Sequence, residues 1–327
     1  MIPSPALAAW LADPAAQQAS FGRVQASAAK WGLDPLMTQL ERKLSELDRP
    51  TPEAILVFAH EFMDETVTLD RLVDEMIAGC RADPFFRPPF YPLSGDIHTA
   101  LLLFNNPLLS IALGVTGVDQ LAAKKRGHGG KGSIAFSGLL TSFRYLKAGG
   151  ATLSFWEADP VGEDFVASQA GSARFVGERR LEDGEEIVID GRRESFVIEH
   201  AATDMVYFQA MVRSGGAPVT VEYDRETLQF IGASSTDEAS SRIQMMVSLL
   251  RAMDREDALP LMEKELANPH FYTRWHVMRE MLALDADGAL PALKRMAVGD
   301  PHPEVRAAAG QTLAAFFPDE QAAPCPA

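Results

Sequence analysis

Cysteine is scarce in this sequence, with only Cys80 and Cys325 among 327 residues. Two cysteines cannot form the framework of several disulfides that stabilises small secreted domains. Cys80 has no histidine beside it in the sequence, so a nucleophilic thiol is not indicated either. The apolar fraction of 47% is that of an ordinary soluble globular protein, which is stabilised by an apolar core.

Basic residues are also few: 30 lysines and arginines face 45 acidic residues, which gives a formal net charge of −15. Nucleic-acid binding needs clustered positive charge, so the composition argues against nucleic acid as the main partner. The sequence has one basic cluster, in which Lys124, Lys125, Arg126 and Lys131 lie among glycines.

Long hydrophobic runs are missing as well. The most apolar run, residues 101–118, is interrupted by Asn105-Asn106-Pro107, which predicts a turn and not the middle of a membrane helix. The first basic residue is Arg23, so the start of the chain does not resemble an export signal. We therefore expect a cytoplasmic protein with no membrane partner.

The periodicity of apolar residues changes twice along the chain. It is helical up to about residue 90, strand-like from about 97 to 233, and helical again to the end. A run rich in proline and aromatic residues, 83–92, predicts a linker. The expected regions are a helical N-terminal region with its linker (1–92), an antiparallel β-sandwich or barrel (93–235), helical repeats (236–318) and a disordered tail (319–327).

Short turns separate the strands expected in the central region, among them Asp183-Gly184 and Ser214-Gly215-Gly216. Many short strands without intervening helices indicate a sandwich, jelly roll or barrel, and not a βαβ sheet. The expected strands are 97–104, 108–115, 133–137, 140–147, 151–157, 173–181, 185–190, 194–200, 204–212, 218–224 and 227–232.

Residues 180–190 read Arg-Leu-Glu-Asp-Gly-Glu-Glu-Ile-Val-Ile-Asp. This segment resembles a cupin or RmlC-like jelly roll, and the resemblance covers roughly residues 97–232. It implies a barrel with a pocket for a small molecule or peptide. The chain lacks the His-x-His pair that a typical metal cupin supplies, and also the His-x-Asp pair of the 2-oxoglutarate-dependent oxygenases.

The C-terminal region contains an internal repeat. Ala258-Leu259-Pro260 is followed by Asn-Pro-His at 268–270, and Ala289-Leu290-Pro291 by Asp-Pro-His at 300–302. Arg274 and Arg306 occupy matching positions. Residues 300–309 resemble the second half of a HEAT or HEAT-like repeat, which implies stacked helix pairs over roughly 255–317 that lean on the β body. The expected fold class is thus α+β multidomain: N-terminal helical cap, antiparallel cupin-like jelly-roll body and C-terminal HEAT-like repeats.

His98 and His200 are the two histidines in expected strands, and a jelly roll brings distant strands together. With a carboxylate such as Glu178 they would form a two-His-one-carboxylate site for one divalent metal, iron being favoured. The alternative is that each histidine only makes structural hydrogen bonds.

Arg144, Trp156 and Glu157 lie on the two strands expected around Gly149-Gly150. Inside a barrel, an arginine beside a tryptophan would orient a carboxylate or stack on a planar ligand. The alternative is a cross-strand pair on the surface.

The basic cluster of Lys124, Lys125, Arg126 and Lys131 does not match a phosphate loop, because the glycine spacing is wrong. It predicts a hairpin loop, or a lid that docks an anionic substrate or an acidic peptide. Arg274 is a further candidate for substrate binding where helices meet the β body, although its match with Arg306 favours packing.

Two functional hypotheses follow. The first is a metal-dependent oxygenase, hydroxylase or isomerase that acts on a small molecule or peptide in a barrel pocket closed by flanking helices. The second is a non-enzymatic scaffold that senses a ligand or binds a protein or peptide through its repeats. The fusion of a barrel to two helical regions does not choose between them, because fold does not decide function. Homo-oligomerisation through the barrel is compatible with both.

Overall fold

Five helices form the N-terminal region of the computed structural model, which describes residues 4–127, 132–162 and 165–318. Helices α1 to α4 each begin with a proline in the first turn, and a serine, aspartate or threonine side chain caps each N-terminus. Such a residue pair starts a helix because the cap accepts a free N–H and proline lacks one. The helices are α1 Pro5–Ala12, α2 Pro14–Gly32, α3 Pro35–Ser45, α4 Pro52–Asp64 and α5 Thr66–Ala82.

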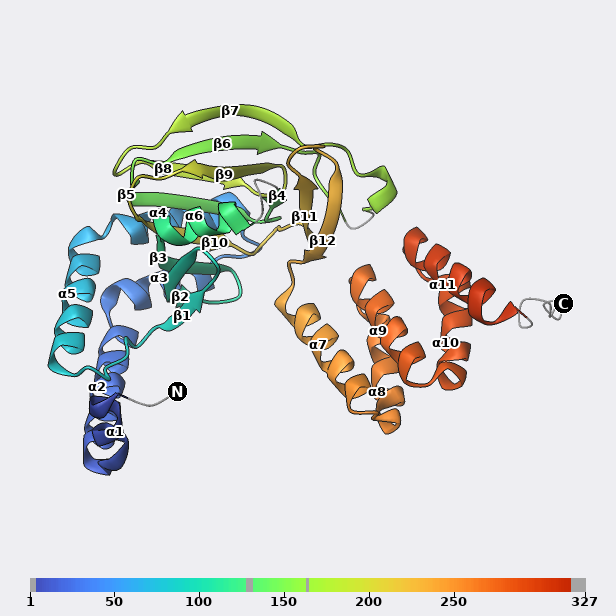
Figure 1. The fold of residues 1–327 in the computed structure, drawn as a ribbon, viewed down its shortest axis with the longest axis horizontal. Helices are drawn as coiled ribbons and strands as arrows, with labels where there is room; N and C mark the ends of the chain where they lie inside the picture. Colours follow the sequence, from blue (N-terminus) through green and yellow to red (C-terminus); the bar gives the residue numbers. More distant parts are fainter. Residues whose placement is uncertain (1–3, 128–131, 163–164, 319–327) are drawn as a thin grey trace.

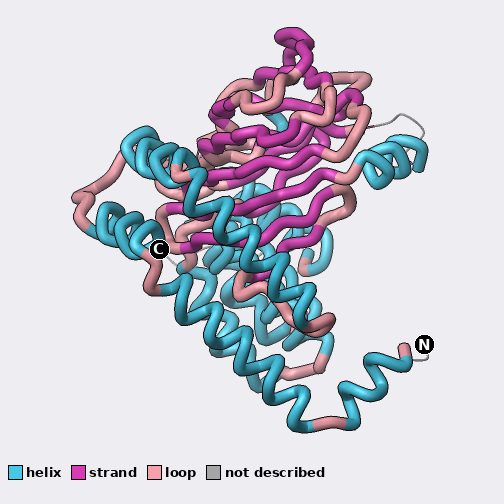
Figure 2. The backbone as a smooth tube through the Cα atoms, turned by 90° about the vertical axis from the view of Figure 1, so that its left-hand side faces the viewer, coloured by secondary structure: helices cyan, strands magenta, loops and turns pink. Residues whose placement is uncertain are grey.

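Helix α4 joins this region to the β body. Its buried residues include Ile55, Ala59 and Phe62, which recur at helical spacing on one face. They share an apolar core with strand residues such as Ile111 and Phe208. One face of the largest sheet is therefore covered by helices (Figure 2).

The β body contains a six-stranded sheet with the order β1-β2-β3-β10-β5-β8 and two three-stranded sheets with the orders β12-β11-β4 and β7-β6-β9. All of the pairings are antiparallel. The strands are β1 Tyr91–Ser94, β2 His98–Asn105, β3 Leu109–Thr116, β4 Ser133–Phe136, β5 Leu140–Lys147, β6 Thr152–Glu157, β7 Arg174–Arg180, β8 Glu186–Asp190, β9 Glu194–His200, β10 Met205–Val212, β11 Val219–Asp224 and β12 Phe230–Ser235.

The strand order is that of a jelly roll. β10 lies between β3 and β5, while β11, the next strand along the chain, pairs with β4 in another sheet. From β3 to β11 the chain thus crosses repeatedly between sheets, as in the Greek-key arrangement of cupin-like double sheets. β4 also contacts β9, which brings the two smaller sheets side by side. The expected cupin-like jelly-roll body is confirmed.

Strand β10 shows how the body is layered. Phe208, Ala210 and Val212 face the N-terminal helices, whereas Met205 and Tyr207 face the interior of the body. Successive side chains of a strand point to opposite faces, so this alternation buries β10 on both sides.

One helix interrupts the β body where the sequence predicted a hairpin loop. Helix α6, Val118–Gly127, contains Lys124, Lys125 and Arg126, so that prediction is wrong for these residues. Lys131 lies outside the described residues. Asp204 accepts a hydrogen bond from the Val118 amide at 2.9 Å, and Leu121 packs into the core of the body, so α6 is held against the barrel.

The C-terminal region forms two stacked helix pairs behind a connecting helix, as the repeat predicted. Arg274 donates to the carbonyl oxygens of Asn268 and Pro269, and Arg306 donates in the same way to those of Asp300 and Pro301. The helices are α7 Glu238–Ala252, α8 Leu259–Lys264, α9 Phe271–Leu284, α10 Ala286–Gly299 and α11 Pro303–Phe316, with single 3₁₀ turns at Ala167–Gln169, Glu256–Ala258 and Glu265–Ala267.

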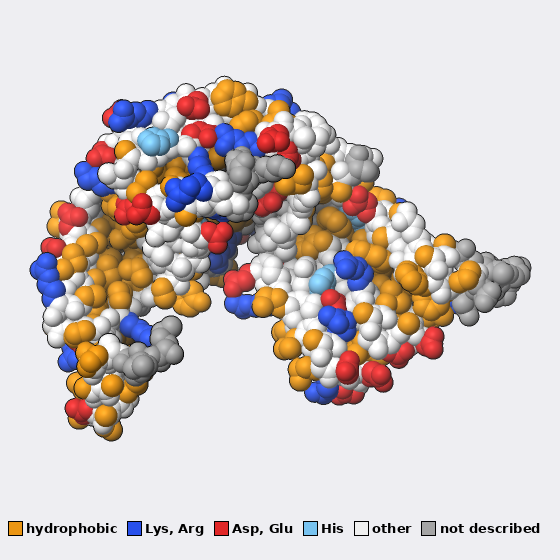
Figure 3. All heavy atoms as spheres, in the orientation of Figure 1, with side chains coloured by type: hydrophobic (Ala, Val, Ile, Leu, Met, Phe, Trp, Pro, Cys, Tyr) orange, Lys and Arg blue, Asp and Glu red, His pale blue; other side chains and the backbone are white. Residues whose placement is uncertain are grey.

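The two helical regions extend from opposite ends of the β body (Figure 1). The molecule is therefore an arch, hollowed between the N-terminal and C-terminal helices (Figure 3). Among the described residues, no helix is long and apolar enough to cross a membrane.

Candidate binding site at the mouth of the β body

A cleft of about 720 Å³ opens at the mouth of the β body, beneath helix α6. Its apolar walls are formed by Ile97, Leu121, Phe196 and Ile198. Mouths of β-barrels are common ligand sites, and this volume is within the usual range for small-molecule pockets. The charged side chains on its rim are Asp96, Lys124, Lys125, Glu222 and Arg225.

Glu199 organises the cations beside the cleft. Arg225 forms an ion pair with its carboxylate, and Ser154 donates a hydrogen bond to the same oxygen. Lys125 donates to the Glu199 carbonyl oxygen, with its Nζ 3.8 Å from the carboxylate. Burial by itself would raise the pKa of Glu199, but the hydrogen bonds from Arg225 and Ser154 and the nearby positive charges lower it. Glu199 is therefore a carboxylate that fixes two cations at the mouth.

Lys124 is held less firmly. Its Nζ lies 3.3 Å from Asp96, and both side chains are well exposed to solvent. Exposed ion pairs of this kind contribute only about 0–1 kcal/mol. A ligand carboxylate can thus replace Asp96 as the partner of Lys124 at little cost.

An aromatic cluster lies behind the cleft. Phe196 packs edge to face on Phe143, with ring centroids 5.3 Å apart, and Phe143 also contacts Tyr145 and Tyr207. Burial raises the pKa of both tyrosines, and Thr116 lies 3.3 Å from the Tyr207 hydroxyl. Phe196 is the member of this cluster that lines the cleft, and the uncharged aromatic rings lie behind it.

The residues predicted to hold a metal are not brought together. His98 lies on β2 of the six-stranded sheet, while His200 and Glu178 lie on β9 and β7 of another. Across the described ranges, no three His, Cys, Asp or Glu side chains are grouped so that they could hold a metal ion. The described residues therefore do not supply the two-His-one-carboxylate site that was predicted for a divalent metal.

Arg144, Trp156 and Glu157 do not form the clamp that the sequence suggested. Arg144 points to the face covered by α4, where it pairs with Asp64 and with Glu186. Burial alone would lower the pKa of Arg144, but these two carboxylates raise it.

Trp156 lies in a different core, where its Nε1 donates to Ser154 at 3.0 Å. Glu157 is exposed and lies opposite Arg174 and Glu194 on neighbouring strands. The separation arises because β5 and β6 diverge into different sheets after the Gly149-Gly150 turn.

Some of the residues predicted to bind a substrate line the cleft, and others do not. Lys124 and Lys125 line the cleft, whereas Arg126 is exposed on α6 and does not line it. Arg274 is buried against Asp300, with only 6% of its side chain exposed, so it is not available to a substrate. Its role is structural.

Sequence reasoning missed Arg225 and Asp96, which lie in turns with no motif around them. Arg225 follows β11 directly and reaches the cleft only because β11 pairs with β4. The signal that existed was the alternation of Phe196 and Ile198 along β9, which predicted a buried face.

A comparison with protein-family models supports the C-terminal part of the fold. Residues 232–324 match a family model of HEAT repeats. No curated protein matches the chain.

Among solved structures, the chain is similar to an ectoine synthase from P. lautus (10% identity, 45% of this chain and 85% of that one, TM-score 0.24). It is also similar to an oxalate decarboxylase–formate complex from Lactobacillus farciminis (9% identity, 42% of this chain and 34% of that one, TM-score 0.25). A third similar structure is Fe(II)-HppE (12% identity, 57% of this chain and 97% of that one, TM-score 0.25). Likeness at this level transfers no activity to this chain.

Proposed function

We propose that this protein binds a small organic anion in the cleft at the mouth of its β body and acts as a ligand-binding protein. The observation that carries the proposal is that Lys124, Lys125 and Arg225 converge on a cleft with apolar walls. An apolar pocket with a few convergent polar groups is the usual form of a small-molecule site.

The charge balance of the rim favours a ligand with one anionic group. Lys125 and Arg225 are already positioned by Glu199, so they need little reorganisation to meet a second carboxylate. The contact of Lys124 with Asp96 is exposed to solvent. A ligand carboxylate would take over that contact in a less solvated position, where charged hydrogen bonds are stronger.

The walls favour a ligand body that is apolar and compact. Phe196 presents an aromatic ring, and Ile97, Leu121 and Ile198 complete an aliphatic surface. A phenyl ring or a short alkyl chain attached to the anionic group would remove this surface from water, at about 25 cal/mol per Å².

Binding without catalysis is favoured by the state of the titratable groups. Neighbouring cations and Ser154 hold Glu199 ionised, and burial keeps Tyr145 and Tyr207 neutral. General acid–base catalysis is most efficient when the pKa of the catalytic group lies near the working pH. These groups are shifted away from neutrality, so they are suited to hold a ligand and not to exchange protons with it.

The test is a titration with matched acids and amides. Benzoate, phenylacetate and hexanoate would be compared with benzamide, phenylacetamide and hexanamide by isothermal calorimetry and by the shift in melting temperature. We expect binding of at least one acid and much weaker binding of its amide. Equal binding of acid and amide, or no binding of any acid, would contradict the proposal.

Substitution of Lys124 by alanine should weaken binding of the acid by about tenfold, the value of one charged hydrogen bond. Arg126→Ala is the matched control, because Arg126 lies on the same helix but outside the cleft. An equal effect of the two substitutions would indicate general electrostatic attraction and not a specific site.

A further inference from the structure

The edge of the β12-β11-β4 sheet is open along the second half of β12, whereas Gln229, just before β12, forms an isolated antiparallel bridge with Ser172. β12 is the terminal strand of its sheet, and it pairs only with β11 over Phe230–Ser235. Its last four residues, 232–235, are Gly, Ala, Ser and Ser, and a Cβ added at Gly232 would contact nothing within 4 Å. Alternate backbone N–H and C=O groups of such a strand point away from the sheet, unpaired.

Two other edge strands are protected. β1 contains Pro92, and β7 carries Arg174, Glu178, Arg179 and Arg180. Proline and charged residues are the usual means of preventing a further strand from pairing with an edge. β12 contains neither proline nor a charged residue, so it lacks both of these protections.

A cleft of about 670 Å³ runs beside this edge, between β12 and the C-terminal helices. Its aromatic lining includes Phe230 from β12 and Tyr272 and Trp275 from α9. Figure 1 shows β12 on the side of the body that faces α9 and α11. The backbone edge and the apolar cleft are therefore next to each other.

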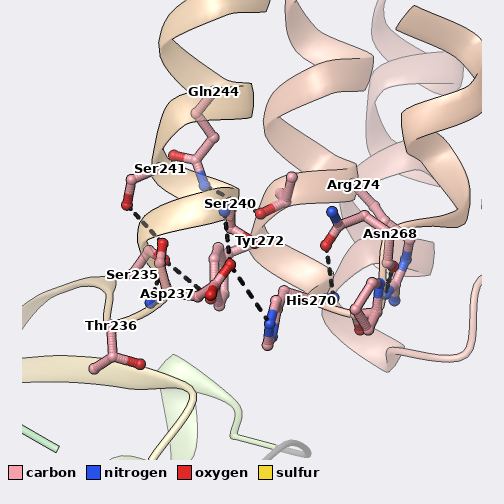
Figure 4. Close-up of polar contacts among 12 residues, drawn as sticks. Ser235, Thr236, Asp237, Ser240, Ser241, Gln244, Asn268, His270, Tyr272 and Arg274 are labelled. Atoms are coloured by element: carbon pink, nitrogen blue, oxygen red, sulfur yellow. Dashed lines mark hydrogen bonds and ion pairs between the residues drawn. The ribbon is translucent and has the colours of Figure 1, made fainter. Parts of the chain in front are cut away.

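Polar contacts hold the cleft open in a defined shape (Figure 4). The Ser235 hydroxyl lies 3.1 Å from the Tyr272 hydroxyl and so links the end of β12 to α9. Asp237 caps α7 by accepting from the Ser240 amide, and Gln244 donates to Thr273 at 3.2 Å. A partner would enter a preformed groove, which lowers the entropic cost of binding.

The groove is lined by one arginine and one glutamate, Arg279 and Glu304. Arg279 lines the cleft and is exposed, and within the described part of the chain it has no ion pair. Glu304 accepts a hydrogen bond from the Ala167 amide, and His276 lies 3.6 Å from Glu280. An acidic group on a bound partner would therefore find Arg279 available.

We propose that β12 receives an extended peptide of a partner protein as an added strand, with an apolar side chain in the aromatic cleft and an acidic side chain on Arg279. The four residues at 232–235 line the cleft, so about four residues of the peptide would pair, roughly 13 Å of strand. Main-chain hydrogen bonds would supply affinity, and alternate side chains would supply specificity. This site is separate from the anion site at the barrel mouth.

The experiment uses the full chain and a positional-scanning library of fluorescein-labelled octapeptides, measured by fluorescence anisotropy. We expect the selected peptides to carry an aromatic or aliphatic residue and a nearby Asp or Glu. Methylation of the backbone nitrogen should abolish binding at every second position of the paired segment and be tolerated at the positions between. A peptide held only by its side chains would not show that alternation.

Arg279→Glu should lower affinity for the acidic peptides by at least tenfold and shift selection towards Lys or Arg. Arg295→Glu is the matched control, because Arg295 is an exposed arginine on α10 outside the cleft. Circular dichroism would confirm that both variants remain folded.

Three results would overturn the proposal: no peptide selected, equal tolerance of N-methylation at all positions, or equal effects of the two substitutions. Light scattering tests a second copy of this chain as the occupant. Dimerisation that Ser234→Lys abolishes would assign the edge to self-association and refute the peptide proposal.

Discussion

The buried pair of Arg274 and Asp300 should be the most important polar contact of the C-terminal repeats. Arg274 donates from Nε and Nη2 to the two carboxylate oxygens at 2.8 and 2.7 Å, and the two side chains are only 6% and 4% exposed. Asp300 also accepts from the His302 amide at 2.8 Å, which fixes the turn before α11. The pair therefore joins α9 to the α10–α11 turn.

Arg274→Ala would leave the Asp300 carboxylate buried without its partner and free the carbonyls of Asn268 and Pro269. Loss of one member of a buried ion pair costs about 3–5 kcal/mol. Arg306 occupies the same position in the second repeat, but it is half-buried and donates only to carbonyl oxygens. Arg306→Ala should therefore cost less, about 1–2 kcal/mol.

Hydrogen exchange of amides in α9, α10 and α11, followed by mass spectrometry, measures the opening free energy of this region in the whole chain. We expect Arg274→Ala to accelerate exchange there much more than Arg306→Ala, with no change in the β body. Equal effects of the two substitutions would refute the reasoning, because they would show that the carboxylate contributes nothing beyond the shared carbonyl contacts.

The same pair should give a pH signature. Burial would raise the pKa of Asp300, but hydrogen bonds from Arg274 and the His302 amide lower it overall. A carboxyl whose pKa is lower in the folded state contributes stability above its unfolded pKa and loses it as the pH falls through the folded value. The difference between wild type and Arg274→Ala should therefore shrink in acid, and a constant difference would contradict this assignment.

Three further predictions concern other regions. Arg144→Met should weaken the attachment of α4 and so lower the denaturant midpoint of unfolding. Binding of organic acids in the cleft, measured by calorimetry, should stay unchanged because Arg144 faces away from it. Phe62→Ala should cost about 3–5 kcal/mol in urea unfolding, because Phe62 is 1% exposed in the core beneath the sheet. Hydrogen bonds from Ser20 and Arg23 lower the pKa of Asp83 to about 2. Asp83→Asn should therefore reduce the protection of α2 against proteolysis at neutral pH. In the wild type this protection should fall only as the pH drops from about 4 towards 2.

Local patterns predicted the elements of this chain well. The strands expected at 140–147 and 194–200 match β5 and β9 to the residue, because alternation and glycine turns are short-range signals. The repeat of Arg274 and Arg306 correctly indicated HEAT-like helix pairs. The prediction of a linker at 83–92 was only partly correct, because residues 91 and 92 belong to strand β1. Pro92 is tolerated there because β1 is an edge strand.

The predictions from sequence were wrong where the chain crosses between sheets. A loop was predicted for the basic cluster that begins at Lys124, yet Lys124, Lys125 and Arg126 form the last turn of helix α6. Arg144 and Trp156 are close in sequence, yet they face different cores because β5 and β6 belong to different sheets. No local signal reports which sheet a strand joins.

The amino-acid sequence by itself determined the three-part organisation, the jelly-roll class of the body and the repeat at the C-terminus. Periodicity and turn residues act over a few positions, so they can be recognised without knowledge of the fold. Only the tertiary structure decided which charged side chains meet. Arg225 reaches Glu199 because β11 and β9 each adjoin β4, whereas His98 and His200 are held on separate sheets. Ion pairs and pockets depend on such long-range strand order, which is set by how the whole core is buried.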